Sequence, residues 1–280
     1  MGVGPGRSDA LIQRQWGRAV PAPFIGFMPP LFGDLNLLTP AATPAWSLKH
    51  IHRLIVNSAT YRQSSRARPD LNALDPNNKL LARQNRFRLD AEIVRDAALC
   101  ASGLLNPKLG GPSVFPPIPD GVMSLGQLKR EWKVSTGDDR YRRGLYTFYF
   151  RATPPPELAV FDAPDAFSTC TRRIHSNTPL QALTLLNDRQ FYELAQGLAA
   201  RLFREGPKSD TDRLDFAFRL CLARAPKPDE KRTLQQLLAQ QLAANENVSG
   251  LSAGTNANLS AGWTTVSRVL LNLDETITRE

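Results

Sequence analysis

Apolar residues recur every three or four positions along most of this chain of 280 residues, which is the spacing of one face of an α-helix. The pattern predicts helices over residues 46–65, 77–105, 179–204 and 210–224, from Pro228 to a small-polar linker at 245–260, and over 261–278. An aromatic run at 144–150 is the clearest strand candidate, with 158–161 as a weaker partner. We therefore expect a mainly α fold, a multi-helix domain with at most a small β-hairpin.

Proline and glycine interrupt the helical pattern in two places. Residues 106–121 are dense in both, and they open a long irregular midsection. This segment lacks the Gly-Lys-Ser/Thr ending of a phosphate-binding loop. Residues 1–45 contain seven prolines and few charges. We expect them to form a poorly ordered leader, followed by a single helix-rich domain over 46–280.

The segment 171–188 joins a basic, irregular stretch to a strongly signalled helix start. Thr178 is placed to cap the helix, Pro179 suits its first position, and Gln181 would complete a capping box. The apolar stripe is expected to continue at Leu180, Leu183 and Leu186. The junction is therefore predicted to fix the path of the chain, and any chemistry should lie just before it.

The chain has a net charge of +9 and a pI of about 9.8, which favours an anionic partner: nucleic acid, acidic polysaccharide or a membrane surface. The arginines alternate with acidic residues along the predicted helices, an arrangement more typical of a solvated, salt-bridged surface. No apolar run reaches the roughly 18 residues of a membrane span, and no signal peptide is visible. Three histidines and three cysteines show no metal-binding or haem-attachment spacing, so we expect no metal and no cofactor.

Three basic residues precede the helix that starts at Pro179: Arg172, Arg173 and His175. With the free N–H groups of the helix, they could bind an anion or an anionic substrate. The alternative is that they pair with carboxylates such as Asp162, Asp165 or Asp138, and we favour this structural interpretation.

An acidic cluster, Asp90, Glu92 and Asp96, lies on a predicted helix. Glu92 and Asp96 are four residues apart and share a face, which would suit acid–base chemistry or a divalent cation. Arg88 and Arg95 are near enough to neutralise the cluster. A salt-bridge network is therefore favoured over a catalytic or metal site.

Cationic and aromatic residues occur together just before and within the predicted strand. Arg142 and Arg143 are further candidates for anion binding, and with Arg140 they lie among Tyr141, Tyr146 and Tyr149. This mixture suits stacking on single-stranded nucleic acid or sugar. It equally suits arginines packed over aromatic rings within the protein. No nucleic-acid-binding motif accompanies it, so a nucleic-acid partner is disfavoured.

Several phrases in the same order along the chain resemble a planctomycete-specific family of domains of unknown function, the PSD-one family. They lie at 52–65, 88–97, 110–117, 142–148, 161–164, 177–188 and 268–275, so that the resemblance covers about 46–280. It implies the C-terminal part of a larger, exported protein with a further upstream domain and often a cytochrome-c-like haem domain. No catalytic residues are established for the family. The chain is accordingly expected to be a C-terminal fragment whose partners are the missing upstream domains or a neighbouring protein.

Three classes of function remain open. The favoured one is a non-catalytic structural or interaction module of a larger exported planctomycete protein. The alternative is an enzyme or binding domain that acts on an anionic, perhaps sulfated, polysaccharide, and a basic nucleic-acid-binding domain ranks third. An enzyme should gather Arg172, Arg173, His175 and an acid around one pocket. A module should pair these groups with each other and expose an apolar face.

Overall fold

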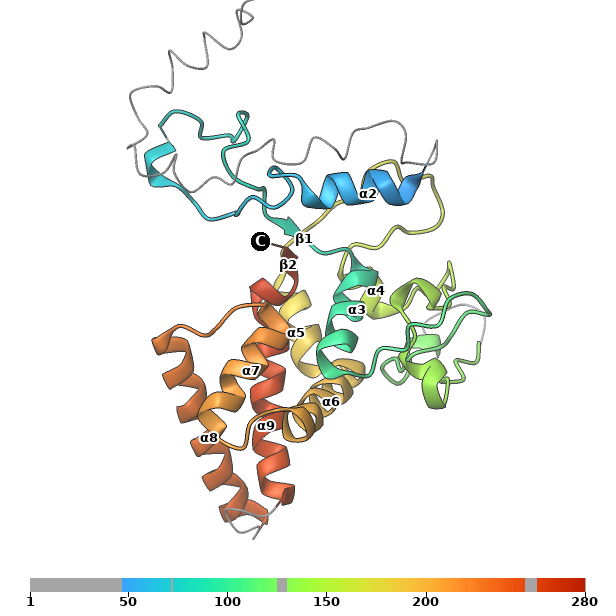
Figure 1. The fold of residues 1–280 in the computed structure, drawn as a ribbon. Helices are drawn as coiled ribbons and strands as arrows, with labels where there is room; N and C mark the ends of the chain where they lie inside the picture. The colour runs from blue at the N-terminus through green and yellow to red at the C-terminus, as the bar shows by residue number, and fades with distance from the viewer. Residues whose placement is uncertain (1–46, 72, 125–129, 250–255, 280) are drawn as a thin grey trace, which may run out of the picture. The chain divides into compact units, whose positions relative to one another are not determined.

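The computed structural model describes residues 47–71, 73–124, 130–249 and 256–279 (Figure 1). The chain divides into two compact units, residues 1–62 and 63–280. The described residues contain eight α-helices and one two-stranded antiparallel sheet, which confirms the mainly α fold. Residues 1–45, for which we expect a leader, lie outside the described residues. No helix of the described part is long and apolar enough to cross a bilayer.

The described part of the first unit consists of α2 (Leu48–Asn57) and the turns after it. Ser47 caps α2, because its hydroxyl accepts a hydrogen bond from the backbone N–H of His50 at 3.2 Å. The helix ends at Asn57, well before the predicted residue 65. Ser58 adopts an extended conformation there, and its hydroxyl donates to the carbonyl of Ile55.

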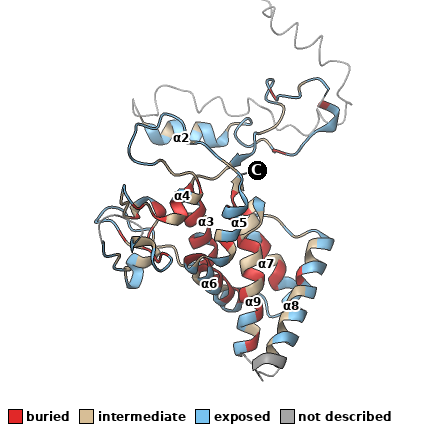
Figure 2. Cartoon of the chain, turned by 180° about the vertical axis from the view of Figure 1, so that it is seen from behind, coloured by how far each residue is buried: buried red, intermediate tan, exposed pale blue. Residues whose placement is uncertain are grey.

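The second unit is built around helices that pack through apolar side chains. These helices are α3 (Ala91–Ser102), α4 (Pro156–Val160), α5 (Pro179–Asn187), α6 (Arg189–Glu205), α7 (Asp210–Leu222), α8 (Pro228–Ser249) and α9 (Asn256–Leu271). Helix α9 packs against α6 and α8, and α6 also packs against α3 (Figure 1). Buried residues line the facing sides of α3, α6, α7 and α9 (Figure 2). Trp263 of α9 is fully buried between the ring of Phe203 and the guanidinium of Arg213.

The helix predicted over 77–105 is wrong in its first half. Asp75 closes a loop there by accepting hydrogen bonds from the backbone N–H groups of Lys79 and Leu80. In the same loop, the backbone of Asn78 is in a left-handed conformation (φ 51°), and its side-chain amide donates to the carbonyl of Arg83. Only the second half is helical, as α3. This helix ends close to the predicted residue 105, because Gly103 has a φ of 74° and closes it.

The helix predicted over 179–204 is two helices. The chain becomes extended at Asp188 (ψ 138°), and the Asp188 carboxylate accepts from the backbone N–H of Gln190 at 2.8 Å, so that α6 starts afresh. Thr178 and Pro179 do occupy the cap and first positions of α5, but no side-chain hydrogen bond caps the helix. The expected capping box is therefore absent.

Gln181 explains why that capping box does not form. Its side chain is buried, donates to the carbonyl of Val160 and to the hydroxyl of Ser176, and accepts from Arg88. The prediction that the apolar stripe of this helix faces the core is also wrong. Leu180 and Leu183 are 56% and 53% exposed, whereas Gln181 and Leu185 face the core.

The strand predicted over 144–150 is also wrong. Gly144–Tyr146 forms a single 3₁₀ turn, and the predicted partner 158–161 falls largely within α4. The two strands of the sheet are β1 (Phe87–Arg88) and β2 (Thr278–Arg279), with Phe87 opposite Arg279. They join the segment before α3 to residues near the end of the chain. Helix α8 extends to Ser249 and α9 begins at Asn256, so the two helices extend into the linker predicted over 245–260 from both sides. Helix α9 ends at Leu271, before the predicted residue 278.

Replacing Trp263 by alanine should lower the free energy of unfolding by about 3–5 kcal/mol, because it removes a fully buried aromatic side chain and leaves a cavity at α9. Urea denaturation followed by circular dichroism measures this change. Leu109→Ala, at a site that is 78% exposed, is the control and should change stability by less than about 0.5 kcal/mol. Equal effects of the two substitutions would contradict the described core.

Candidate functional site

The acidic cluster predicted from the sequence lies at the N-terminal end of α3, and each of its carboxylates binds a different basic side chain. Asp90 occupies the cap position, and its Oδ1 lies 2.9 Å from Nε2 of His175. Glu92, in the first turn, binds Arg173 through two contacts of 2.6 and 3.1 Å. A longer contact of 3.7 Å links Arg173 to Asp90 as well. The basic junction and the acidic cluster therefore meet, although they lie more than 80 residues apart.

The third carboxylate, Asp96, binds a different loop. Its Oδ2 accepts from Nε of Arg143 at 2.9 Å, and its Oδ1 accepts from the backbone N–H of Gly144 at 2.6 Å. Glu92 and Asp96 thus lie on one helix, as predicted, but they serve two separate loops. Gly144 is required here, because a methyl group on its Cα would lie 2.7 Å from the carbonyl oxygen of Glu92.

The pairs of Glu92 and Asp96 are partly buried, which makes them stronger than exposed pairs, whereas the contact between Asp90 and His175 is exposed. Side-chain exposure is 22% for Glu92 and 12% for Asp96. The two-pronged contact with Glu92 raises the pKa of the Arg173 guanidinium above its ordinary value. The carboxylates at the start of α3 therefore bind two segments: the junction before α5, and the loop that follows residue 140. Arg88 and Arg95, the expected partners of the cluster, bind elsewhere: Arg88 contacts Gln181 and Asp274, and Arg95 the carbonyl of Arg140.

The remaining two candidate cations differ from each other. Arg142 is 1% exposed, and its guanidinium donates to the carbonyls of Lys108, Gly110 and Pro112 while it lies over the ring of Tyr146. It therefore holds the Gly/Pro-rich segment in place from inside the protein. Arg172 is exposed, has no ion-pair partner among the described residues, and lines a hollow of about 500 Å³ together with residues 162–165 and 168–171.

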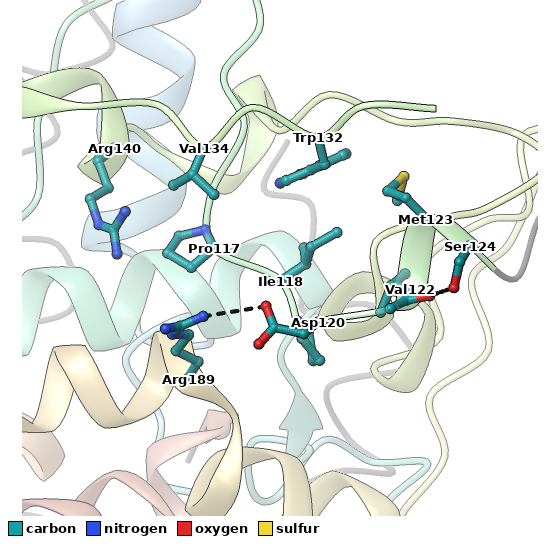
Figure 3. A pocket seen from close by; sticks show the side chains of 12 residues that line it. Pro117, Ile118, Asp120, Val122, Met123, Ser124, Trp132, Val134, Arg140 and Arg189 are labelled. Carbon is teal, nitrogen blue, oxygen red and sulfur yellow. Dashed lines mark hydrogen bonds and ion pairs between the residues drawn. The ribbon is translucent and has the colours of Figure 1, made fainter. Parts of the chain in front are cut away.

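A second hollow, of about 430 Å³, was not foreseen from the sequence (Figure 3). Its walls are the proline-rich segment 117–124 and the side chains of Trp132, Val134, Arg140 and Arg189. Trp132 is fixed by donating from Nε1 to the carbonyl of Pro116 at 2.7 Å. Arg189, at the start of α6, reaches Asp120 at 3.5 Å, and both side chains are largely exposed. The proline-rich composition could have suggested a rigid wall, but nothing local pointed to Arg189.

Arg140 connects this hollow to the protein interior. It donates to Glu193 of α6, and Tyr141 donates to the same carboxylate at 2.6 Å. Burial opposes ionisation of Glu193, but these hydrogen bonds outweigh it and lower the pKa of that carboxyl. Tyr149 in turn donates to the carbonyl of Pro164. The cations and rings that suggested stacking on nucleic acid are thus largely engaged within the protein.

A family model for proteins of unknown function, PSD1 (DUF1553), matches residues 38–238, more than two thirds of the chain. The chain belongs to this family. The match includes the acidic cluster, the basic junction and both hollows, and it confirms the resemblance inferred from the sequence phrases. Comparisons with curated proteins and with solved structures found no match.

The PSD1 chain also contains a buried acid that sequence reasoning missed. Glu157 of α4 is 3% exposed, and neither of its carboxylate oxygens has a hydrogen-bond partner among the described residues. Burial raises the pKa of Glu157 to about 7, against the attraction of Arg95. Arg95 is itself buried, and burial lowers its pKa to about 10. Burial also raises the pKa of Asp188. No signal in the sequence marks Glu157, because it lies in a five-residue helix after three prolines.

The arrangement of acidic and basic side chains in this PSD1 chain bears on the chemistry that it could perform. Among the described residues, no three or more His, Cys, Asp or Glu side chains are grouped so that they could hold a metal ion. The acids and bases around α3 are bound to each other, and neither hollow combines a free acid with a free base. The geometry therefore supports binding and structural roles better than acid–base chemistry.

Gly144→Ala should destabilise the protein by about 1–3 kcal/mol, because the added methyl group would overlap the backbone of Glu92 and push the loop away from α3. Thermal unfolding measures the change. Ser113→Ala, in an exposed part of a neighbouring segment, serves as the control. Unchanged stability for Gly144→Ala would show that the loop does not approach α3 this closely.

Glu157 should make stability depend on pH. Its pKa is about 7 in the folded protein and about 4.5 in the unfolded chain, so the folded state holds the proton more tightly. This contribution is fully present below pH 4.5, declines as the pH rises towards 7, and amounts to on the order of 3 kcal/mol. Glu157→Gln should flatten this decline in urea-denaturation series between pH 4.5 and 8. If the mutant and the parent lose stability in parallel, Glu157 does not titrate as described.

Proposed function

We propose that this PSD1 chain is a non-catalytic structural and interaction module of a larger exported planctomycete protein that also carries cytochrome-c-like domains. The observation that carries the proposal is the pairing of His175 with Asp90 and of Arg173 with Glu92. An enzyme that used these groups would hold them unpaired around a pocket. In the described protein they bind the junction before α5 to α3 instead.

A second observation supports an interaction role. Leu180 and Leu183 lie three residues apart on α5, so they share one face, and more than half of each side chain is exposed. Ile174, in the junction before this helix, is 76% exposed. Apolar side chains grouped on a well-fixed helix are typical of a surface that a partner covers. The partner we expect is a neighbouring domain of the parent protein or a separate polypeptide.

Binding of an anionic polysaccharide is the second candidate. The hollow between Trp132 and Arg189 supports it, because an indole ring can stack on a sugar and a guanidinium can bind a sulfate or carboxylate group (Figure 3). The prolines of the opposite wall stiffen the hollow before any ligand arrives. The ion pair between Arg189 and Asp120 is exposed and therefore weak, so an anion could displace it.

Site-specific photo-crosslinking in the producing cell tests the interaction role. A photoreactive amino acid at Leu180 or Leu183 should yield one discrete cross-linked polypeptide, and the same group at the exposed Leu109 should not. Turnover of a sulfated polysaccharide by the purified chain, abolished by Glu92→Gln and by His175→Gln, would overturn the proposal in favour of an enzyme. Equal cross-linking from all three positions would also contradict it.

A further inference from the structure

Helix α2 carries an apolar side that none of the described residues buries. Leu48, Ile51, Leu54 and Ile55 recur at the helical spacing and fall within one sector of about 120°. No residue of α2 is buried, and Leu48 is 74% exposed, with Ile51 and Ile55 at 50%. Most amphipathic helices bury such a sector against a core. This one presents its apolar residues to something other than the described part of the chain.

The other side of α2 is cationic. Lys49 and Arg53 are four residues apart and point away from the apolar sector, and Arg62 follows the helix. None of these three cations has an ion-pair partner among the described residues. Several arginines of the second unit are instead paired: Arg173 binds Glu92, and Arg224 binds both Glu230 and Glu275.

The sequence around α2 is rich in positive charge, although Arg68, at the end of this stretch, pairs with Asp70 at 2.7 Å. No aspartate or glutamate occurs from Leu35 to Pro69, while the same stretch contains one lysine and four arginines. These 35 residues thus supply five of the nine net positive charges of the whole chain. A stretch of this kind repels cationic surfaces and attracts anionic ones over roughly 10 Å at physiological salt.

We propose that α2 binds the surface of an anionic lipid bilayer. The apolar sector would enter the boundary between headgroups and acyl chains, and Lys49, Arg53 and Arg62 would contact lipid phosphates. A bilayer accounts for both sides of the helix at once. A nucleic acid would engage the cations but leave the apolar sector in water, and a second copy of the chain would bring equal positive charges together. The helix lies on the bilayer, because ten residues span only about 15 Å.

Vesicle flotation with the full chain tests this proposal. At low salt the protein should float with vesicles of phosphatidylcholine and phosphatidylglycerol and stay behind with pure phosphatidylcholine. Lys49→Gln/Arg53→Gln should weaken binding more than tenfold, at roughly fivefold per charge. Ile51→Ser/Ile55→Ser should weaken it by at least tenfold, since it removes two of the inserting side chains. Both pairs are exposed, so circular dichroism should show an unchanged fold.

The matched control is Lys79→Gln/Lys108→Gln, which removes the same charge from two exposed lysines outside α2 and should alter binding less than threefold. Three results would overturn the proposal. The first is equal flotation with neutral and anionic vesicles, and the second is equal loss in the control and the Lys49/Arg53 variant. The third is absence of flotation together with a dimer, seen by analytical ultracentrifugation, that Ile51→Ser/Ile55→Ser dissociates. That outcome would assign the apolar side to a second copy.

Discussion

The loops of the second unit are held by three carboxylates at the start of α3, each bound to a basic side chain from later in the chain. The segments they bind have few regular backbone hydrogen bonds of their own, so side chains must hold them in place. Asp90 and Glu92 hold the junction before α5, and Asp96 holds the loop at Gly144. Glu92 and Asp96 are partly buried, and partly buried charges are costly unless they are paired, so these two contacts favour one arrangement of the loops.

Once these loops are fixed, the two hollows and the exposed side of α5 follow. The junction ends at Pro179, and Gln181 then anchors α5 to Val160 and Arg88. That anchoring turns Leu180 and Leu183 outward, where they are available to a partner. The same loops carry Arg172 and Arg140 to the edges of the two hollows. The pairing of charges at α3 thus creates the surfaces of this PSD1 protein, although it occupies the groups that catalysis would need.

The sequence predicted the elements whose signals are local. Gly103 ends α3 because a left-handed residue is required there, and Pro179 starts α5 because it needs no N–H donor. The break at Asp188 was missed because an aspartate can continue a helix or start a new one, and the choice depends on packing around α6. Gln181 was misread for a similar reason, since its partners Val160 and Arg88 are distant in sequence. At the candidate site, the residues could be named in advance, but their partners could not, because ion pairs between distant residues leave no trace in local spacing.

The most direct test of this account is a double-mutant cycle between Glu92 and Arg173, measured as free energies of unfolding for Glu92→Gln, Arg173→Gln and the double mutant. The two-pronged, partly buried contact predicts a coupling energy on the order of 1 kcal/mol, so that the double mutant is more stable than the sum of the single losses implies. Additivity of the two substitutions within about 0.3 kcal/mol would contradict the account. Arg173 and Glu92 would then be free to act on a ligand instead of on each other.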